Sequence, residues 1–180
     1  VTGGPLQPEF GNTPSFLLPY TQKQDEITTP ADYNNLGRPQ AQPRTVSIAS
    51  LLSTNNAATG GIAASTGGYY TATIKGANAF PAGAKLRAVA LQGYFTQVTG
   101  PAAPPAAPVA RHAISVIKAV SGDTERRIVV DSKKCAGCHE WLEAHGGNRV
   151  AEAQVCVACH VPGLATSGRG IADTTLNPFM

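Results

Sequence analysis

The sequence predicts a mainly β fold. An immunoglobulin-like antiparallel sandwich over residues 45–131 follows an extended arm over residues 1–44 and precedes a small, partly helical module over residues 132–180. Charged residues make up only 14% of the 180 residues, while 19 glycines and 14 prolines favour strands and turns over long helices. Short apolar segments also alternate with turn residues at intervals typical of sandwiches. All four cysteines lie in the C-terminal module, where the composition changes.

The arm is rich in proline and shows no sustained hydrophobic period of 2 or 3.6 residues, so we expect extended chain without regular structure. It is too apolar for an ordinary disordered tail. Two arrangements would bury the apolar side chains of such a segment: it packs on its own domain, or it wraps around a neighbouring subunit. The apolar residues available to anchor it are Phe10, Phe16, Leu17, Leu18 and Tyr20.

Five segments of residues 45–131 have the character of strands, because apolar and β-branched side chains recur in them between turn residues. They are Thr45–Leu52, Tyr69–Lys75, Ala84–Val98, Arg111–Val120 and Glu125–Asp131. Gly93 is expected to form a bulge in the third segment. The turns and loops between them are Asn55–Gly61, Asn78–Gly83, the proline-rich Gly100–Pro108, and Gly122-Asp123.

The C-terminal module contains one five-residue motif twice, as Cys135-Ala-Gly-Cys138-His139 and Cys156-Val-Ala-Cys159-His160. C-x-x-C-H is the covalent attachment site of a c-type haem. The two thiols add across the two vinyl groups of the porphyrin, and the adjacent histidine is placed under the iron. The sequence therefore predicts two haem c sites. Apart from a helix expected over Cys135–His145 and ended by Gly146-Gly147, no large apolar face is visible, so we expect the haems to form the core of this module.

Other uses of these cysteines are less consistent with the pattern. The spacing C-x2-C-x17-C-x2-C falls within the range of four-cysteine zinc sites, but zinc does not require a histidine directly after each pair. Two disulfides would each close a two-residue loop, which stabilises little. A thioredoxin-type redox pair would need a βαβ setting, which the sequence does not indicate.

Four histidines are present, the number that two bis-histidine haems require. His139 and His160 are the expected proximal ligands. His145 is expected on the same helix as His139 and so on the same side of the first haem. We therefore expect it to ligate the second haem, if it is a ligand. His112, on a predicted strand, either reaches the first haem or is a half-buried strand histidine with a backbone partner.

Several other residues are weaker candidates near the haems. Met180 is the only methionine, and Trp141 is the only tryptophan and could pack on a haem face. For each of these two, an unrelated role remains open. The basic residues that could pair with haem propionates, or simply be solvated, are Arg126, Lys133, Lys134 and Arg149.

The formal net charge of +3 does not indicate a nucleic-acid partner, because two oxidised haems with their propionates lower it to about +1. No run of 18 apolar residues is present, so no membrane-spanning segment is expected. No basic and then apolar N-terminal segment is present either, so we expect no signal peptide within these residues. Haem attachment to C-x-x-C-H motifs normally takes place outside the cytoplasm, which predicts an exported protein.

One stretch resembles a known family. The two motifs, together with His145-Gly146-Gly147-Asn148-Arg149 between them and the junction Arg126–Asp131 before them, look like the extracellular multihaem c-type cytochromes of the OmcA and MtrC type. The resemblance covers residues 125–163, is looser over residues 69–120 and is absent over residues 1–44. It implies a β-sandwich running into a haem pair, and it implies His145 as an axial ligand.

The resemblance also implies a function, which is electron transfer through closely spaced bis-histidine haems. The expected location is the extracellular or outer-membrane surface, and the expected partners are other multihaem cytochromes, minerals or electrodes. Family members carry many more haems than two, so the chain is either part of a multihaem conduit or a dihaem subunit that polymerises with copies of itself into a conducting filament. A haem enzyme with one open axial site is the remaining alternative. With both axial positions filled, we expect no enzyme.

Overall fold

The computed structural model describes residues 10–11, 14–22, 29–54, 57–97, 109–112, 114–139 and 142–162. Of residues 10–11, 40, 54, 95–97 and 109–112 it describes the backbone alone. The described residues form mainly antiparallel β structure with few helices, as the composition predicts. The more specific immunoglobulin-like arrangement stays a prediction. Among these residues no helix combines the length and the apolar character needed to cross a bilayer.

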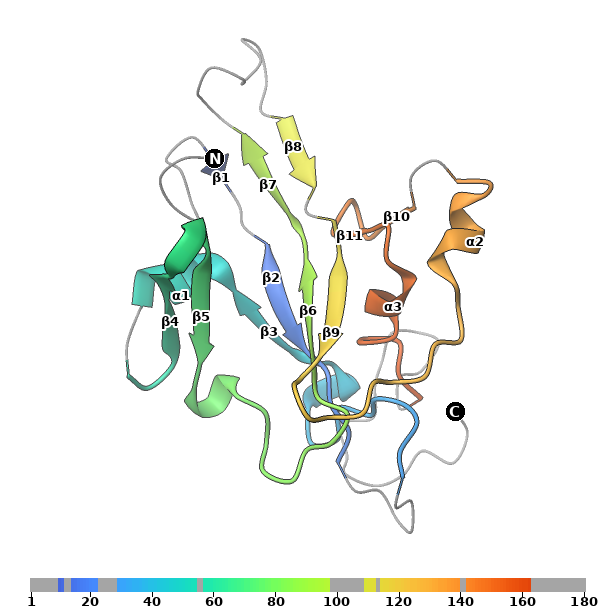
Figure 1. Cartoon of the computed structure of the whole chain (residues 1–180), viewed down its shortest axis with the longest axis horizontal. Helices are drawn as coiled ribbons and strands as arrows, with labels where there is room; N and C mark the ends of the chain where they lie inside the picture. Colours follow the sequence, from blue (N-terminus) through green and yellow to red (C-terminus); the bar gives the residue numbers. More distant parts are fainter. Residues whose placement is uncertain are drawn as a thin grey trace.

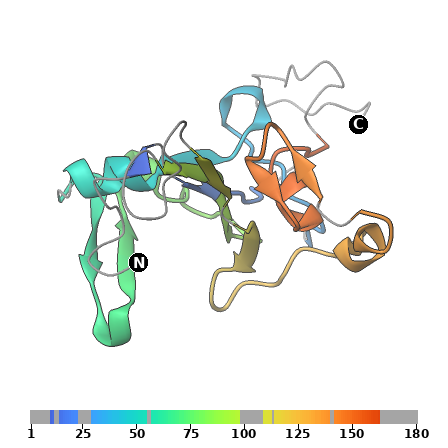
Figure 2. The same cartoon turned by 90° about the horizontal axis from the view of Figure 1, so that it is seen from above.

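The centre of the molecule is a four-stranded antiparallel sheet, in the order β3 (Arg44–Ser47), β2 (Ser15–Leu18), β6 (Ala88–Gln92) and β9 (Val116–Ala119) (Figure 1). Successive side chains of a strand point to opposite faces, and both faces of this sheet are covered. Leu17 and Ala90 face the C-terminal module. Leu18 and Val46 face α1 (Ile48–Thr54) and the hairpin of β4 (Gly60–Ala64) and β5 (Tyr70–Ile74). Figure 2 shows this hairpin and the C-terminal module at opposite ends of the molecule.

The described part of the expected arm is integrated into this sheet. Strand β2 lies between β3 and β6, with Leu17 opposite both Thr45 and Ala90. The strand escaped sequence analysis because it is buried on both faces, so its apolar residues do not alternate with polar ones. Pro14 and Pro19 flank it and confine it to four residues. The segment is thus part of the β domain.

Two predicted strands are wrong in whole or in part. The strand expected over Thr45–Leu52 ends at Ser47, and Ile48–Thr54 is the helix α1. The hydroxyl of Ser47 accepts a hydrogen bond from the amide of Ser50 at 3.5 Å, the position of a helix cap. The segment Glu125–Asp131 pairs with no strand in the described part of the chain, and its β-branched residues Ile128–Val130 are exposed because no described strand covers them.

The remaining strands follow the sequence more closely. The strand predicted over Tyr69–Lys75 is confirmed as β5. The long segment Ala84–Val98 is broken at Gly93, whose φ of 108° favours glycine, into β6 and β7 (Tyr94–Gln97). Strand β7 leaves the central sheet and joins β1 (Phe10–Gly11) and β8 (Val109–His112) in a second, three-stranded sheet. The predicted Gly100–Pro108 loop lies outside the described residues.

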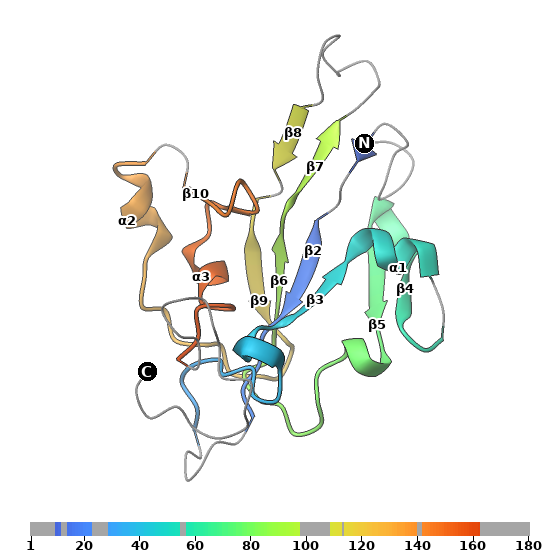
Figure 3. The same cartoon turned by 180° about the vertical axis from the view of Figure 1, so that it is seen from behind.

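The C-terminal module consists of α2 (Ser132–Ala136), the short hairpin of β10 (Glu143–Ala144) and β11 (Arg149–Val150), and α3 (Ala153–Cys156). The helix expected over Cys135–His145 is wrong, since α2 ends at Ala136. The Gly146-Gly147 pair does not end a helix but forms the turn of the β10–β11 hairpin. Figures 1 and 3 both place α3 between α2 and β9.

Candidate functional site

Both Cys-x-x-Cys-His motifs adopt the same local structure. In each, the amide of the second cysteine donates to the carbonyl of the first at 3.2 Å, and the histidine amide donates to the same carbonyl at 2.9 Å. This tight turn overlaps the end of a short helix that contains the first cysteine, and the second cysteine and the histidine follow directly after it. The two motifs, which share the spacing of a c-type haem attachment site, thus also share one backbone geometry.

An acidic cap precedes each motif by the same interval, which sequence analysis overlooked. The carboxylate of Asp131 accepts from the amide of Lys133 at 3.0 Å and caps α2. The carboxylate of Glu152 accepts from the amide of Gln154 at 2.8 Å and caps α3. Each acid stands four residues before the first cysteine of its motif. A carboxylate at a helix N-terminus is stabilising there, so the pattern Asp/Glu-x-x-x-Cys-x-x-Cys-His was readable from the sequence.

The two motifs differ sharply in burial. Around the second, Val155 and Ala158 are fully buried against Leu17 and Ala90 of the central sheet. In the first, no residue of α2 is buried, and both Cys138 and His139 are exposed. The second motif is thus anchored by packing, whereas the first extends from the surface.

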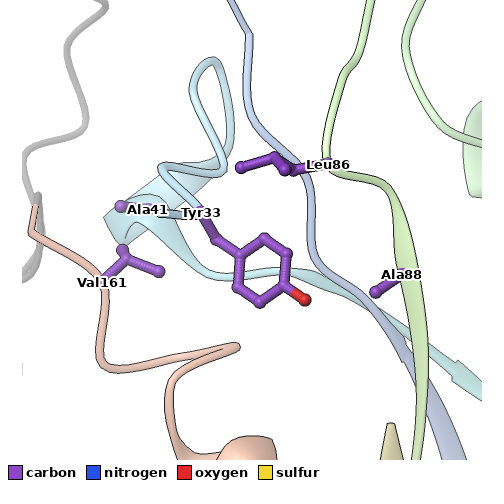
Figure 4. Packing of buried hydrophobic residues seen from close by; sticks show 5 residues of the cluster. All are labelled: Tyr33, Ala41, Leu86, Ala88 and Val161. Carbon is purple, nitrogen blue, oxygen red and sulfur yellow. The ribbon is translucent and has the colours of Figure 1, made fainter. Parts of the chain in front are cut away.

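Residues of the expected arm hold the second motif, a role that sequence analysis missed. The side-chain amide of Asn35 donates to the carbonyl of Ala158 at 2.9 Å, and that of Gln42 donates to the carbonyl of Cys159 at 3.2 Å. Tyr33 lies in one apolar cluster with Val161, which directly follows His160 (Figure 4). The arm therefore contributes to the surroundings of the second motif. No local sequence signal reveals this, because the partners are over 100 residues apart.

His145 lies at the start of the hairpin turn. Its φ of 55°, followed by 63° at Gly146 and 84° at Gly147, is a left-handed run that a helix excludes and that glycine permits. The hairpin is fixed to the end of the central sheet. The amide of Gly93 donates to the carbonyl of Asn148 at 2.8 Å, and the amide of Val150 donates to the hydroxyl of Ser115 at 3.0 Å. These contacts place His145 in a defined position near the second motif.

The imidazole rings of His145 and His160 have centroids 6.2 Å apart and planes inclined by 39°. An imidazole nitrogen binds a transition-metal ion at about 2 Å and lies about 1 Å from its ring centre, so two imidazoles on opposite sides of one ion have centroids about 6 Å apart. The observed spacing therefore fits a pair of axial ligands on a single iron. The structure brings together the two histidines that sequence analysis expected at the second haem.

The structure shows no axial pairing for the other two histidines among the described side chains. His139 is exposed at the end of the first motif. His112 is in β8, where its backbone lies opposite that of Tyr94, and its side chain is outside the described part of the structure. Its ligation of the first haem stays a prediction. Trp141 and Met180 lie outside the described residues.

Charges near the second motif act on its thiols. Burial raises the pKa of Cys159, and the guanidinium of Arg149, which contacts this thiol, opposes the rise. Burial also raises the pKa of Cys156, again opposed by Arg149.

The basic residues considered for propionates have different surroundings. Arg126 forms an ion pair with Asp32 at 2.6 Å, and its guanidinium lies over the ring of Tyr33, 5.9 Å from the ring centroid, so it packs against the core. Lys133 and Lys134 are exposed beside the first motif.

The four cysteines are all within the described residues, and none of them forms a disulfide there. They belong to two separate turns, and in the described part of the chain no three or more His, Cys, Asp or Glu side chains gather as metal ligands would.

Comparison with known proteins returns no match to a family model, a curated protein or a solved structure.

Proposed function

We propose that the chain is an electron-transfer protein with two covalently bound c-type haems, attached at Cys135 and Cys138 and at Cys156 and Cys159. His139 and His160 are the proximal ligands, and His145 is the distal ligand of the second haem. When bound, each haem supplies a one-electron redox centre. The chain's own residues would attach it through two thioether bonds and ligate its iron. The observation that carries the proposal is the 6.2 Å spacing of the His145 and His160 rings.

An axial pair of histidines favours electron transfer over catalysis. An iron with both axial positions occupied has no position for a substrate, so it changes only its oxidation state. We therefore propose a carrier and not an enzyme. In the setting that the sequence resembles, the chain is exported, its β domain is of the immunoglobulin-like type, and its haems pass electrons along a multihaem conduit to other cytochromes or to an extracellular acceptor.

The test is His145→Ala, with Glu143→Ala as the matched control, because Glu143 is an exposed residue of the same hairpin. The pyridine haemochrome assay should give two haems per chain in the wild type and in both variants. After reduction, Glu143→Ala should bind no more carbon monoxide than the wild type. His145→Ala should bind one further equivalent per chain and should show a high-spin band that the wild type lacks at the second haem. A fully low-spin His145→Ala protein would overturn the ligand assignment, and a haem-free wild type would overturn the function.

A further inference from the structure

Packing does not fix the first haem-binding helix in place. No residue of α2 is buried, whereas α3 buries Val155 completely against the central sheet. A five-residue helix is also far too short to be stable in isolation. The orientation of α2 relative to α3 must therefore come from polar contacts or from the haem itself.

Such contacts join the first turns of the two helices. The hydroxyl of Ser132 donates to Oε1 of Glu152 at 2.8 Å and accepts from the amide of Ala153 at 2.9 Å. The same Oε1 accepts from the amide of Gln154 at 2.8 Å. One carboxylate oxygen thus caps α3 and holds the first residue of α2. The side chain of Gln154 adds a hydrogen bond to the carbonyl of Val130, just before α2.

These hydrogen bonds can fix the position of α2 relative to α3. They are partly buried and involve an ionised acceptor, which makes them stronger than neutral ones. Ser132 stands three residues before Cys135, and Glu152 stands four residues before Cys156. The contact therefore lies about one helical turn from the first attachment point of each haem.

We propose that Ser132 and Glu152 are positioning residues that set the mutual orientation of the two haems. The inference rests on the proposed function. Neither residue ligates or attaches a haem, so removing the contact leaves both haems bound and both sets of axial ligands unchanged. It frees α2 to reorient relative to α3, so that the angle and distance between the two porphyrins become variable. Electron transfer between the haems depends on both quantities.

The experiment uses the haem-loaded chain and compares Ser132→Ala with Asp131→Ala. Asp131→Ala removes the cap of α2 but keeps every hydrogen bond between the helices, so it controls for loss of helix stability. Ser132→Thr retains the hydroxyl and is the rescue variant. The readouts are the exciton couplet in the Soret circular dichroism of the oxidised protein and the spin–spin interaction of the two ferric haems in its electron paramagnetic resonance spectrum. Both depend on haem–haem geometry.

The Ser132→Ala protein should lose most of the exciton couplet, and the strength of its spin–spin interaction should be spread over a wider range, because the haem–haem distance and angle vary. The spectra of Asp131→Ala and Ser132→Thr should resemble those of the wild type. The inference fails if Ser132→Ala matches the wild type, if Asp131→Ala loses as much, or if the wild type has two haems but no couplet. The haemochrome assay separates these failures from failure of the proposed function, which would show as a wild type without two haems.

Discussion

The side-chain amide of Asn35 donates a hydrogen bond of 2.9 Å to the carbonyl of Ala158, a residue inside the second Cys-x-x-Cys-His motif. Asn35 is fully buried and has a φ of 45°. Its amide group also donates to the carbonyl of Ala41 at 2.8 Å, and its Oδ1 accepts from the amide of Tyr20 at 3.2 Å. One side chain therefore joins the segment that follows β2, the next loop and the second Cys-x-x-Cys-His motif.

Replacing Asn35 should destabilise the protein strongly. Asn35→Ala leaves three buried backbone groups without a side-chain partner, and we expect the free energy of unfolding to fall by about 3 kcal/mol. Asn35→Asp has the same size but places a carboxylate against the two carbonyls that the amide served, so it should cost at least as much at neutral pH. Urea unfolding followed by far-UV circular dichroism measures both. A change below about 0.5 kcal/mol for Asn35→Ala would contradict this role.

A side chain at Gly93 should destabilise the fold. A Cβ at this position would lie 3.0 Å from Cα of Pro14, and the φ of 108° is strained for any other residue. We expect Gly93→Ala to lower the free energy of unfolding by about 3 kcal/mol, and to shift the hairpin that carries His145 because Gly93 donates to Asn148.

The matched control for that variant is Gly83→Ala. Gly83 also has a positive φ, of 76°, but a Cβ there would meet nothing within 4 Å. It should show only the backbone cost, about 1 kcal/mol. If the two variants lose the same free energy of unfolding in urea, the contact between a Cβ at position 93 and Pro14 does not contribute to the cost of Gly93→Ala.

The first motif should depend on its haem for order, because no residue of α2 is buried. In a Cys135→Ala/Cys138→Ala double variant, which cannot attach the first haem, α2 should unfold more often, so that the backbone after Lys133 and Lys134 enters the active site of trypsin more readily. We expect cleavage there to be faster than in the wild type, while Lys118 in β9 stays protected in both proteins. Mass spectrometry of timed digests measures the rates. If cleavage at Lys133 and Lys134 is as fast in the wild type as in the double variant, the haem does not cover this helix.

What the sequence predicted well depended on local patterns. Tyr70–Ile74 alternates because one side of the strand faces other apolar residues, and the cysteine and histidine spacing within each motif reflects a single turn. Even the acidic caps Asp131 and Glu152 follow a readable interval. These features involve residues close together in the chain, so a pattern in the sequence contains them.

What it missed depended on tertiary contacts. Leu17 and Leu18 are buried on opposite faces of an inner strand, so they show no alternation. The run Ile128–Val130 has the composition of a strand, but among the described residues no strand pairs with it. The contacts Asn35–Ala158 and Ser132–Glu152 join segments distant in the chain, and no local pattern predicts them.

Tyr33 connects the stability of the fold to alkaline pH. Its side chain is only 4% exposed, and burial raises its pKa from 10.0 to about 12, with the nearby Arg126 opposing the rise. Because the folded state holds the phenol proton more tightly than the unfolded state, the stabilisation is complete below pH 10 and is lost as the pH rises to about 12. The loss at the upper end should be about 2 kcal/mol.

Tyr33→Phe keeps the ring in its cluster with Val161 and removes the ionisable group. We expect its free energy of unfolding at pH 7 to lie within about 1 kcal/mol of the wild type, and its decline between pH 10 and 12 to be smaller. Urea unfolding at a series of pH values measures this decline. Tyr69→Phe, at a side chain that is 76% exposed, is the control and should keep the decline of the wild type. The same decline in Tyr33→Phe as in the wild type would place the titrating group elsewhere.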